Sequence, residues 1–243
     1  MTLTATGGFN TKINYVTIEP VENNAVACTP ISTLDCDEIA VNLPFSLEFT
    51  GLEGGLANTG FTMADPPSAR IAADGPITNP DVPGFEPSRL TVANGQLTVN
   101  AAKGLAFVFN GTGTGTSTEV NSQINTLGVG FDASLGAFDI QTTIINPYTD
   151  SDATNEFEQG GIWFGLDEDN YVKLVAQNGG NVEMRAEEDA VSPNNSQVIV
   201  NAVTGLHTNP VTLRLRVDPV AETLTAFYTV GNDTETLLGT IDL

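Results

Sequence analysis

The segment Val211-Thr-Leu-Arg-Leu-Arg-Val217 carries the pattern that decides the fold class. Apolar and polar residues alternate at every position, and successive side chains of a strand point to opposite faces of a sheet, so this segment predicts a half-buried β-strand. The residues predicted to face the core are Val211, Leu213, Leu215 and Val217. Arg214 and Arg216 then lie on the opposite face.

The same reasoning extends along the chain, where Gly, Thr, Asn and Asp interrupt short apolar segments and no sustained helical period occurs. We therefore predict an all-β protein, a sandwich of two antiparallel sheets. The predicted strands are Lys12–Ile18, Phe45–Thr50, Gln96–Asn100, Leu105–Phe109, Leu127–Phe131, Ala137–Ile145, Gly160–Leu166, Tyr171–Ala176, Asn181–Ala186, Gln197–Asn201, Val211–Val217, Thr223–Val230 and Thr236–Asp242.

Two Asn-Gly pairs, Asn94-Gly95 and Asn178-Gly179, lie between alternating segments and predict hairpins with primed turns, in which the backbone needs positive φ. Residues 61–87 are rich in proline, which cannot donate a hydrogen bond to a sheet, so they predict a long loop.

Charge restricts the partners. The 243 residues hold 8 Lys plus Arg against 30 Asp plus Glu, a formal net charge of -22. Nucleic-acid binding depends on neutralising phosphates, so we expect no nucleic-acid partner and no attraction to anionic lipid. The apolar runs are much shorter than the roughly 20 residues that span a bilayer, so we expect no membrane insertion.

Cys28 and Cys36 are the two cysteines of the chain. With His207 as the only histidine, the soft ligands are too few for a zinc site. The short separation between Cys28 and Cys36 leaves two interpretations: a local disulfide that closes a loop, or two free thiols. The disulfide would indicate an oxidising compartment.

Four of the eight basic residues are predicted on non-core faces of neighbouring strands; these are Lys173, Arg185, Arg214 and Arg216. One interpretation is a solvated face with ion pairs to Glu183 and Glu187. The other is a concave polar face whose cations hold the hydroxyls or carboxylates of a ligand.

A resemblance begins at Gln159-Gly-Gly-Ile-Trp-Phe-Gly-Leu-Asp-Glu-Asp-Asn-Tyr-Val-Lys-Leu174 and continues in Leu213-Arg-Leu-Arg-Val-Asp218 and Leu224-Thr-Ala-Phe-Tyr228. These segments resemble concanavalin A-like jelly-roll domains, including laminin-G-like modules and the C-terminal sandwich of β-xylosidases. The resemblance implies a jelly roll over 43–243 and a bacterial extracellular protein of several modules.

The N-terminal stretch Gly8-Phe-Asn-Thr-Lys-Ile-Asn-Tyr-Val-Thr-Ile18 is similar to the last strand of malectin and other galactose-binding-like modules. Residues 1–18 would then be the tail of a preceding module, with 19–42 as a linker that holds the cysteine pair. The alternative is an edge strand of the main sandwich.

Catalysis is not expected. Glucanases of this fold place paired carboxylates on one strand, and no such strand is present. Alginate-lyase-like jelly rolls use Gln-[Ile/Val]-His, whereas this chain reads Gln123-Ile-Asn125.

A structural Ca²⁺ is expected, because hard oxygen ligands are abundant. The first candidate is the acidic segment with Asp150 and Asp152. The alternative interpretation of this segment is a solvated turn that binds no metal. The Asp167–Asn170 turn is a second candidate with the same alternative. The third brings Glu48 near Asp242, if the first and last strands of the main domain pair.

Trp163 is the only tryptophan, and an aromatic ring can stack on a sugar, although a lone Trp is also a common core residue. The sequence therefore predicts a non-catalytic module of a secreted or cell-surface protein, monomeric, calcium-stabilised and attached to neighbouring modules, that binds a polysaccharide or other glycan. The predicted ligand-binding residues are Trp163, Tyr171, Lys173, Glu183, Arg185, Arg214 and Arg216. The alternatives are a structural or adhesive spacer and, third, a polysaccharide lyase or hydrolase.

Overall fold

The computed structural model describes residues 10–20, 41–65, 85–100, 123–145, 158–167, 170–188 and 198–242. These residues form antiparallel strands, turns and three short 3-10 segments, Leu56–Asn58, Pro87–Arg89 and Ala133–Leu135. The predicted all-β class is confirmed. The described part of the chain holds no helix long and apolar enough to cross a bilayer.

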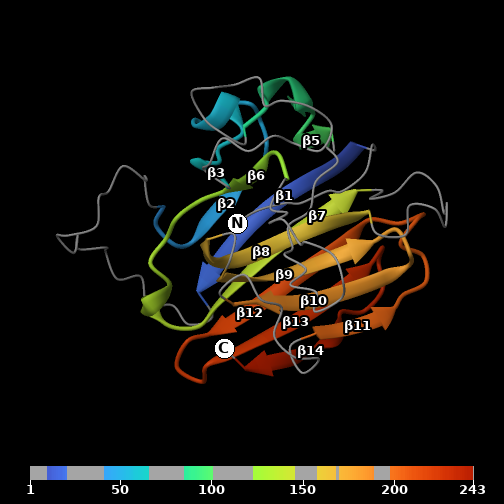
Figure 1. Ribbon diagram of the computed structural model, residues 1–243. Helices are drawn as coiled ribbons and strands as arrows, with labels where there is room; N and C mark the ends of the chain where they lie inside the picture. The colour runs from blue at the N-terminus through green and yellow to red at the C-terminus, as the bar shows by residue number, and fades with distance from the viewer. Residues whose placement is uncertain are drawn as a thin grey trace, which may run out of the picture.

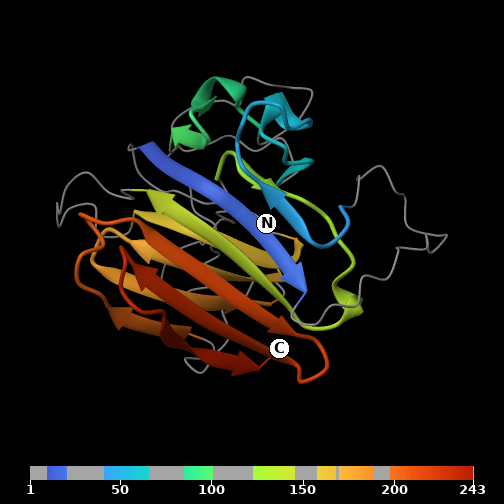
Figure 2. The ribbon, with the colours of Figure 1, turned by 180° about the vertical axis from the view of Figure 1, so that it is seen from behind.

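The larger sheet has eight strands in the order β14-β13-β12-β7-β1-β5-β4, with β2 paired to β1. Its strands are β1 (Asn10–Pro20), β2 (Phe45–Leu47), β4 (Leu90–Ala93), β5 (Gln96–Asn100), β7 (Phe138–Ile145), β12 (Val211–Asp218), β13 (Thr223–Val230) and β14 (Thr236–Asp242). Figure 2 shows this sheet from its outer side.

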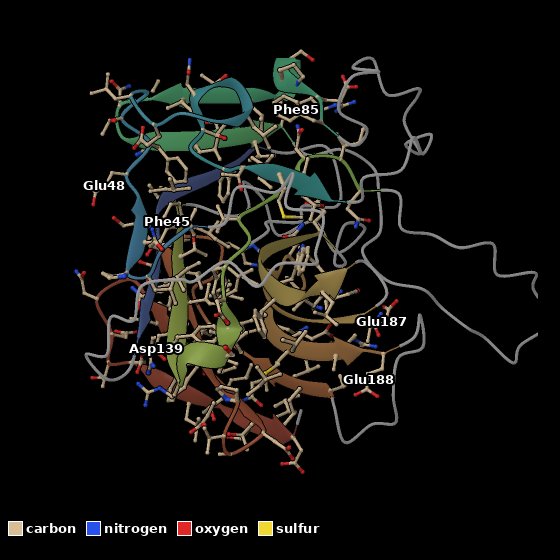
Figure 3. All side chains as sticks on the ribbon, turned by 90° about the vertical axis from the view of Figure 1, so that its left-hand side faces the viewer. Phe45, Glu48, Phe85, Asp139, Glu187 and Glu188 are labelled. Atoms are coloured by element: carbon tan, nitrogen blue, oxygen red, sulfur yellow. The ribbon has the colours of Figure 1, made fainter. Side chains whose placement is uncertain are left out.

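The smaller sheet has the order β11-β10-β9-β8, and a separate two-stranded sheet pairs β3 with β6. Their bounds are β8 (Gln159–Asp167), β9 (Asn170–Gln177), β10 (Asn181–Glu187), β11 (Val198–Ala202), β3 (Met63–Asp65) and β6 (Thr126–Gly128). The four-stranded sheet lies in front of the larger one in Figure 1, and the edge-on view of Figure 3 separates the two layers.

The core lies between these layers. On β12 the burial alternates at every position, as predicted, and Leu213 and Leu215 are fully buried. They join one apolar cluster with residues of the smaller sheet such as Leu174 and Met184. Each fully buried side chain of this size contributes roughly 1.5–3 kcal/mol, so the sandwich is held mainly by burial between the sheets.

Most predicted strands are present, and the differences are instructive. The strands β3 and β4 were not predicted. β3 lies inside the segment that the sequence assigned to a long loop. The predicted strand 105–109 lies outside the described residues. Asn94 and Gly95 both have positive φ, 55° and 70°, as a primed turn requires. The other turn is different. Gln177 pairs with Asn181, so the loop has three residues and only its third, Gly180, has positive φ.

The N-terminal strand corrects the predicted domain division. β1 lies inside the eight-stranded sheet, paired with β7 on one side and with β5 and β2 on the other. Ile18 is fully buried in the common core, opposite Ile140. Residues 10–20 are therefore neither the tail of a preceding module nor an edge strand. Most of the predicted linker, 21–40, lies outside the described residues.

Candidate functional site

The four basic residues predicted to share one face lie on two different sheets. Lys173 is on β9 and Arg185 on β10, in the four-stranded sheet, whereas Arg214 and Arg216 are on β12, in the eight-stranded sheet. The expectation of one cationic surface is wrong, because the chain passes from one layer to the other between β11 and β12.

On the outer face of the eight-stranded sheet, acidic side chains pair with both arginines. Arg216 donates to both carboxylate oxygens of Asp139, at 2.9 and 3.0 Å. Arg214 donates through Nη1 to Asp139 at 3.2 Å and through Nε and Nη2 to Glu235 at 2.8 and 2.5 Å. Its guanidinium carbon also lies 3.9 Å from the centre of the Phe227 ring. These contacts engage both guanidinium groups with the protein's own carboxylates.

The pKa shifts agree with this arrangement. The hydrogen bond to Glu235 raises the pKa of Arg214, and the one to Asp139 raises that of Arg216. In return, Arg214 lowers the pKa of the Glu235 carboxyl. Two positive and two negative charges cancel, so this face has little net charge to offer an anionic ligand.

The other predicted ligand residues do come together. They lie at alternate positions of β8, β9 and β10, on the face of the four-stranded sheet that points away from the core. Trp163 is directly opposite Lys173, which is opposite Arg185, and Tyr171 is opposite Glu187. We call this group the polar cluster; its members are Gln159, Trp163, Tyr171, Lys173, Glu183, Arg185 and Glu187.

Hydrogen bonds join members of the polar cluster in pairs. Lys173 Nζ donates to Gln159 Oε1 at 3.0 Å. The Tyr171 hydroxyl donates to Glu187 Oε2 at 3.1 Å. The carboxylate of Glu183 accepts from Nε and Nη2 of Arg185, at 3.1 and 3.3 Å. The ring centres of Trp163 and Tyr171 are 6.1 Å apart at an interplanar angle of 56°, a tilted aromatic pair.

This face is mostly buried, whereas both interpretations of the sequence, a solvated face with ion pairs and a concave ligand-binding face, placed it in contact with water. Lys173 and Tyr171 are each 7% exposed and Glu183 5%. Burial lowers the pKa of Lys173 to about 8, although the nearby Glu183 carboxylate acts in the opposite direction. Burial, together with the charge of Glu187, raises the pKa of Tyr171. Trp163 remains partly exposed, and the Arg185 side chain is 27% exposed.

Two glycines on β8 define the surroundings of the tryptophan. Gly161 and Gly165 are two positions before and after Trp163, so all three share one face of the sheet. A Cβ atom at either glycine would collide with backbone atoms of β9, which makes glycine necessary for the close approach of the two strands. Because neither glycine carries a side chain, the indole has no side-chain neighbour at the adjacent same-face positions of its own strand.

The predicted calcium sites are not assembled by the described residues. Glu48 follows β2 and Asp242 ends β14, at opposite edges of the larger sheet. Five strand spacings of about 4.8 Å separate these strands, so the two carboxylates do not meet and that prediction is wrong. Asp150 and Asp152 lie outside the described residues, as do Cys28 and Cys36. Within the described ranges, no group of three or more His, Cys, Asp or Glu could hold a metal ion.

Sequence reasoning missed a cavity of about 330 Å³ that is lined by the end of β8, the start of β9 and Asp242 at the end of β14. We call it the end cavity. Its apolar wall includes Phe131, Phe164, Val172 and Leu224. Its lining also includes the acidic residues Glu187, Glu188 and Asp242. These residues come from distant parts of the chain, so no local pattern could have identified them.

Comparisons with protein-family models, curated proteins and solved structures found no match for this chain. We therefore infer function from the geometry of the polar cluster and the end cavity.

Proposed function

We propose that this protein is a non-catalytic glycan-binding module and that the glycan binds at the polar cluster of the four-stranded sheet. One observation carries the proposal: Trp163 is partly exposed and lies between Gly161 and Gly165, beside the ring of Tyr171. An indole with this little cover from its own strand is a platform on which the apolar face of a sugar can stack.

The polar side chains beside the indole supply the second part of the argument. The Arg185 guanidinium is held in place by Glu183, and its side chain is 27% exposed beside the indole, so we assign it donation to a sugar hydroxyl. Lys173, Tyr171 and Glu183 are buried, and we assign them the positioning of Trp163 and Arg185 rather than direct contact. A few polar groups beside an aromatic platform are typical of small-ligand recognition.

The charges favour a neutral glycan over an acidic one. Arg185 is compensated by Glu183, and the arginines of the larger sheet are compensated by Asp139 and Glu235. The chain as a whole carries a net charge of -22, which repels polyanions. We therefore remove Arg214 and Arg216 from the proposed site and expect neutral β-glucans or xylans to bind better than alginate or pectin.

The single tryptophan allows a direct test. Its fluorescence reports on this face alone, so titration with β-glucan, xylan, alginate and pectin oligosaccharides should shift the emission for the neutral ligands. Isothermal titration on Trp163→Ala should show about tenfold weaker binding, or none. Arg216→Ala, on the other sheet, is the matched control and should bind as the unmodified protein does. Silence toward every neutral and acidic glycan would overturn the proposal.

Calcium binding and a secreted or cell-surface location are part of the same proposal. The remaining candidates are the segment with Asp150 and Asp152 and the Asp167–Asn170 turn, because Glu48 and Asp242 are too far apart. Thermal unfolding in Ca²⁺ should then occur at a higher temperature than in EDTA. The double variant Asp150→Asn/Asp152→Asn should lose that difference, and an unchanged difference would exclude this pair.

The compensated arginines also support a second candidate function, a structural or adhesive spacer. The Asp139, Arg214, Arg216 and Glu235 network joins three segments of the larger sheet without leaving a charge for a ligand. Calcium-dependent stabilisation together with a complete absence of glycan binding would favour this function over the first.

A further inference from the structure

We infer that the end cavity binds a small organic cation, an amine whose body is aromatic or branched aliphatic. The end cavity shares Tyr171 and Glu187 with the polar cluster but is not lined by Trp163 or Arg185, and the inference does not depend on the proposed function. It rests on the shape of the cavity, the rigidity of its wall and the sign of its charge.

The shape fits a small molecule. The cavity volume, about 330 Å³, is at the lower end of the range for ligand pockets, roughly 300–1,000 Å³. Its lining is mostly apolar, and Phe131, Phe164 and Leu224 supply most of the large side chains. An apolar body of about the size of a phenyl ring would be removed from water there.

The aromatic wall is held in place from behind. The Phe138 ring packs edge-on against Phe131 and Phe164, with ring centres 5.1 and 5.5 Å apart. The Phe131 and Phe164 centres are 6.2 Å apart. Phe138 is almost completely buried, so it fixes the two lining rings, and a ligand would pay little to order them.

The negative charge of the cavity lining indicates that the ligand also carries a cationic group. The lining contains Glu187, Glu188 and Asp242, and it contains no Lys, Arg or His among the described residues. A concave site with charges of one sign concentrates ions of the other sign. An ammonium group is also attracted to the faces of aromatic rings. An anionic ligand would be repelled on both counts.

A bare metal ion is a weaker occupant, because these acidic residues do not form a cluster able to hold one within the described part of the chain. Apolar walls would also leave a metal ion without the six or more oxygen ligands that Ca²⁺ takes. The combination of an apolar wall with acidic residues fits an amphiphilic cation best.

The test uses three probes of similar shape and different charge: 2-phenylethylamine, 2-phenylethanol and 3-phenylpropionate. Isothermal titration at low salt should show about tenfold tighter binding of the amine than of the alcohol, and no binding of the carboxylate. Glu188 and Asp242 are exposed, so Glu188→Gln/Asp242→Asn removes charge from the lining without altering the core, and it should weaken only the amine.

A second variant tests the position of the site. Ala133 lines the cavity, and Ala133→Phe should fill it and abolish amine binding, with Arg216→Ala as the unaffected control. Equal binding of the three probes, no binding of the amine, or full binding to Ala133→Phe would each overturn the inference. Glycan titration followed by Trp163 fluorescence is a separate readout, so failure of this site is distinguishable from failure of the glycan site.

Discussion

Arg216 holds the carboxylate of Asp139 with two hydrogen bonds, from Nε at 2.9 Å and from Nη2 at 3.0 Å. The two residues are direct cross-strand partners on β12 and β7. Because Arg214 donates to the same carboxylate, one aspartate compensates two cations on the outer face of the larger sheet.

Asp139→Asn should therefore destabilise the protein, since it removes the carboxylate that holds Arg216 and leaves Arg214 paired with Glu235. We expect a loss of about 1 kcal/mol in the free energy of unfolding, because the pairs are bidentate and networked but partly exposed. Urea denaturation at low salt measures it, and in 1 M NaCl the loss should shrink. Asp233→Asn removes an exposed carboxylate as the control; an equal loss there would contradict the prediction.

Lys173 should make stability rise with pH in the alkaline range. Its pKa is about 8 in the folded protein and 10.5 in the unfolded chain, so between these values the unfolded state binds more protons. Relative to Lys173→Met, the free energy of unfolding should be lowest below pH 8 and increase toward pH 10.5, by about 3 kcal/mol at most.

Denaturant unfolding of both proteins at several pH values measures this difference. Using a difference also removes the contribution of other groups, including Tyr171, whose pKa is raised. A difference that does not change with pH would show that Lys173 is not desolvated as described. The charged neighbours Glu183, Arg185 and Glu187 are present in both proteins.

Gly161→Ala should destabilise strongly, because its Cβ would meet the backbone of β9 rather than a flexible side chain. We expect a cost above about 2 kcal/mol. Gly54→Ala is the matched control: a Cβ there has no neighbour within 4 Å, and the change should stay within about 0.5 kcal/mol. Thermal or urea unfolding of both variants tests the close approach of β8 to β9.

Glu53 should contribute stability that is lost in acid. Burial alone would raise the pKa of its carboxyl, but hydrogen bonds from the backbone amides of Thr50 and Glu48 and from the Thr50 hydroxyl lower it to about 2. The advantage over Glu53→Gln should be complete above the unfolded value of 4.5 and disappear as pH falls toward 2. Unfolding of both proteins at pH 2, 4 and 7 measures it, and an advantage of the same size at all three pH values would contradict the prediction.

Local alternation was a reliable guide to strands. Burial alternates along the whole of Val211–Asp218, because side chains of a strand alternate between two faces whatever the strand pairs with. Thr223–Val230 and Thr236–Asp242 also have the predicted bounds. The positive φ values at Asn94 and Gly95 were predictable for a similar reason, since a tight hairpin turn depends on the residues within it. In the loop that begins at Asn178, the residue with positive φ is Gly180, and the loop has three residues rather than the two expected for a primed turn.

The chain by itself therefore determined the all-β class, the core-facing residues of β12 and the overall negative charge. Only the tertiary structure decided that Lys173 and Arg214 lie on different sheets, that β1 is an interior strand, that β9 is buried on both faces and that the end cavity exists. The physical reason is the distance along the chain between the residues that interact. Alternation is a property of neighbouring residues, whereas the sheet a strand joins, and what covers it, depend on contacts between segments far apart in the chain.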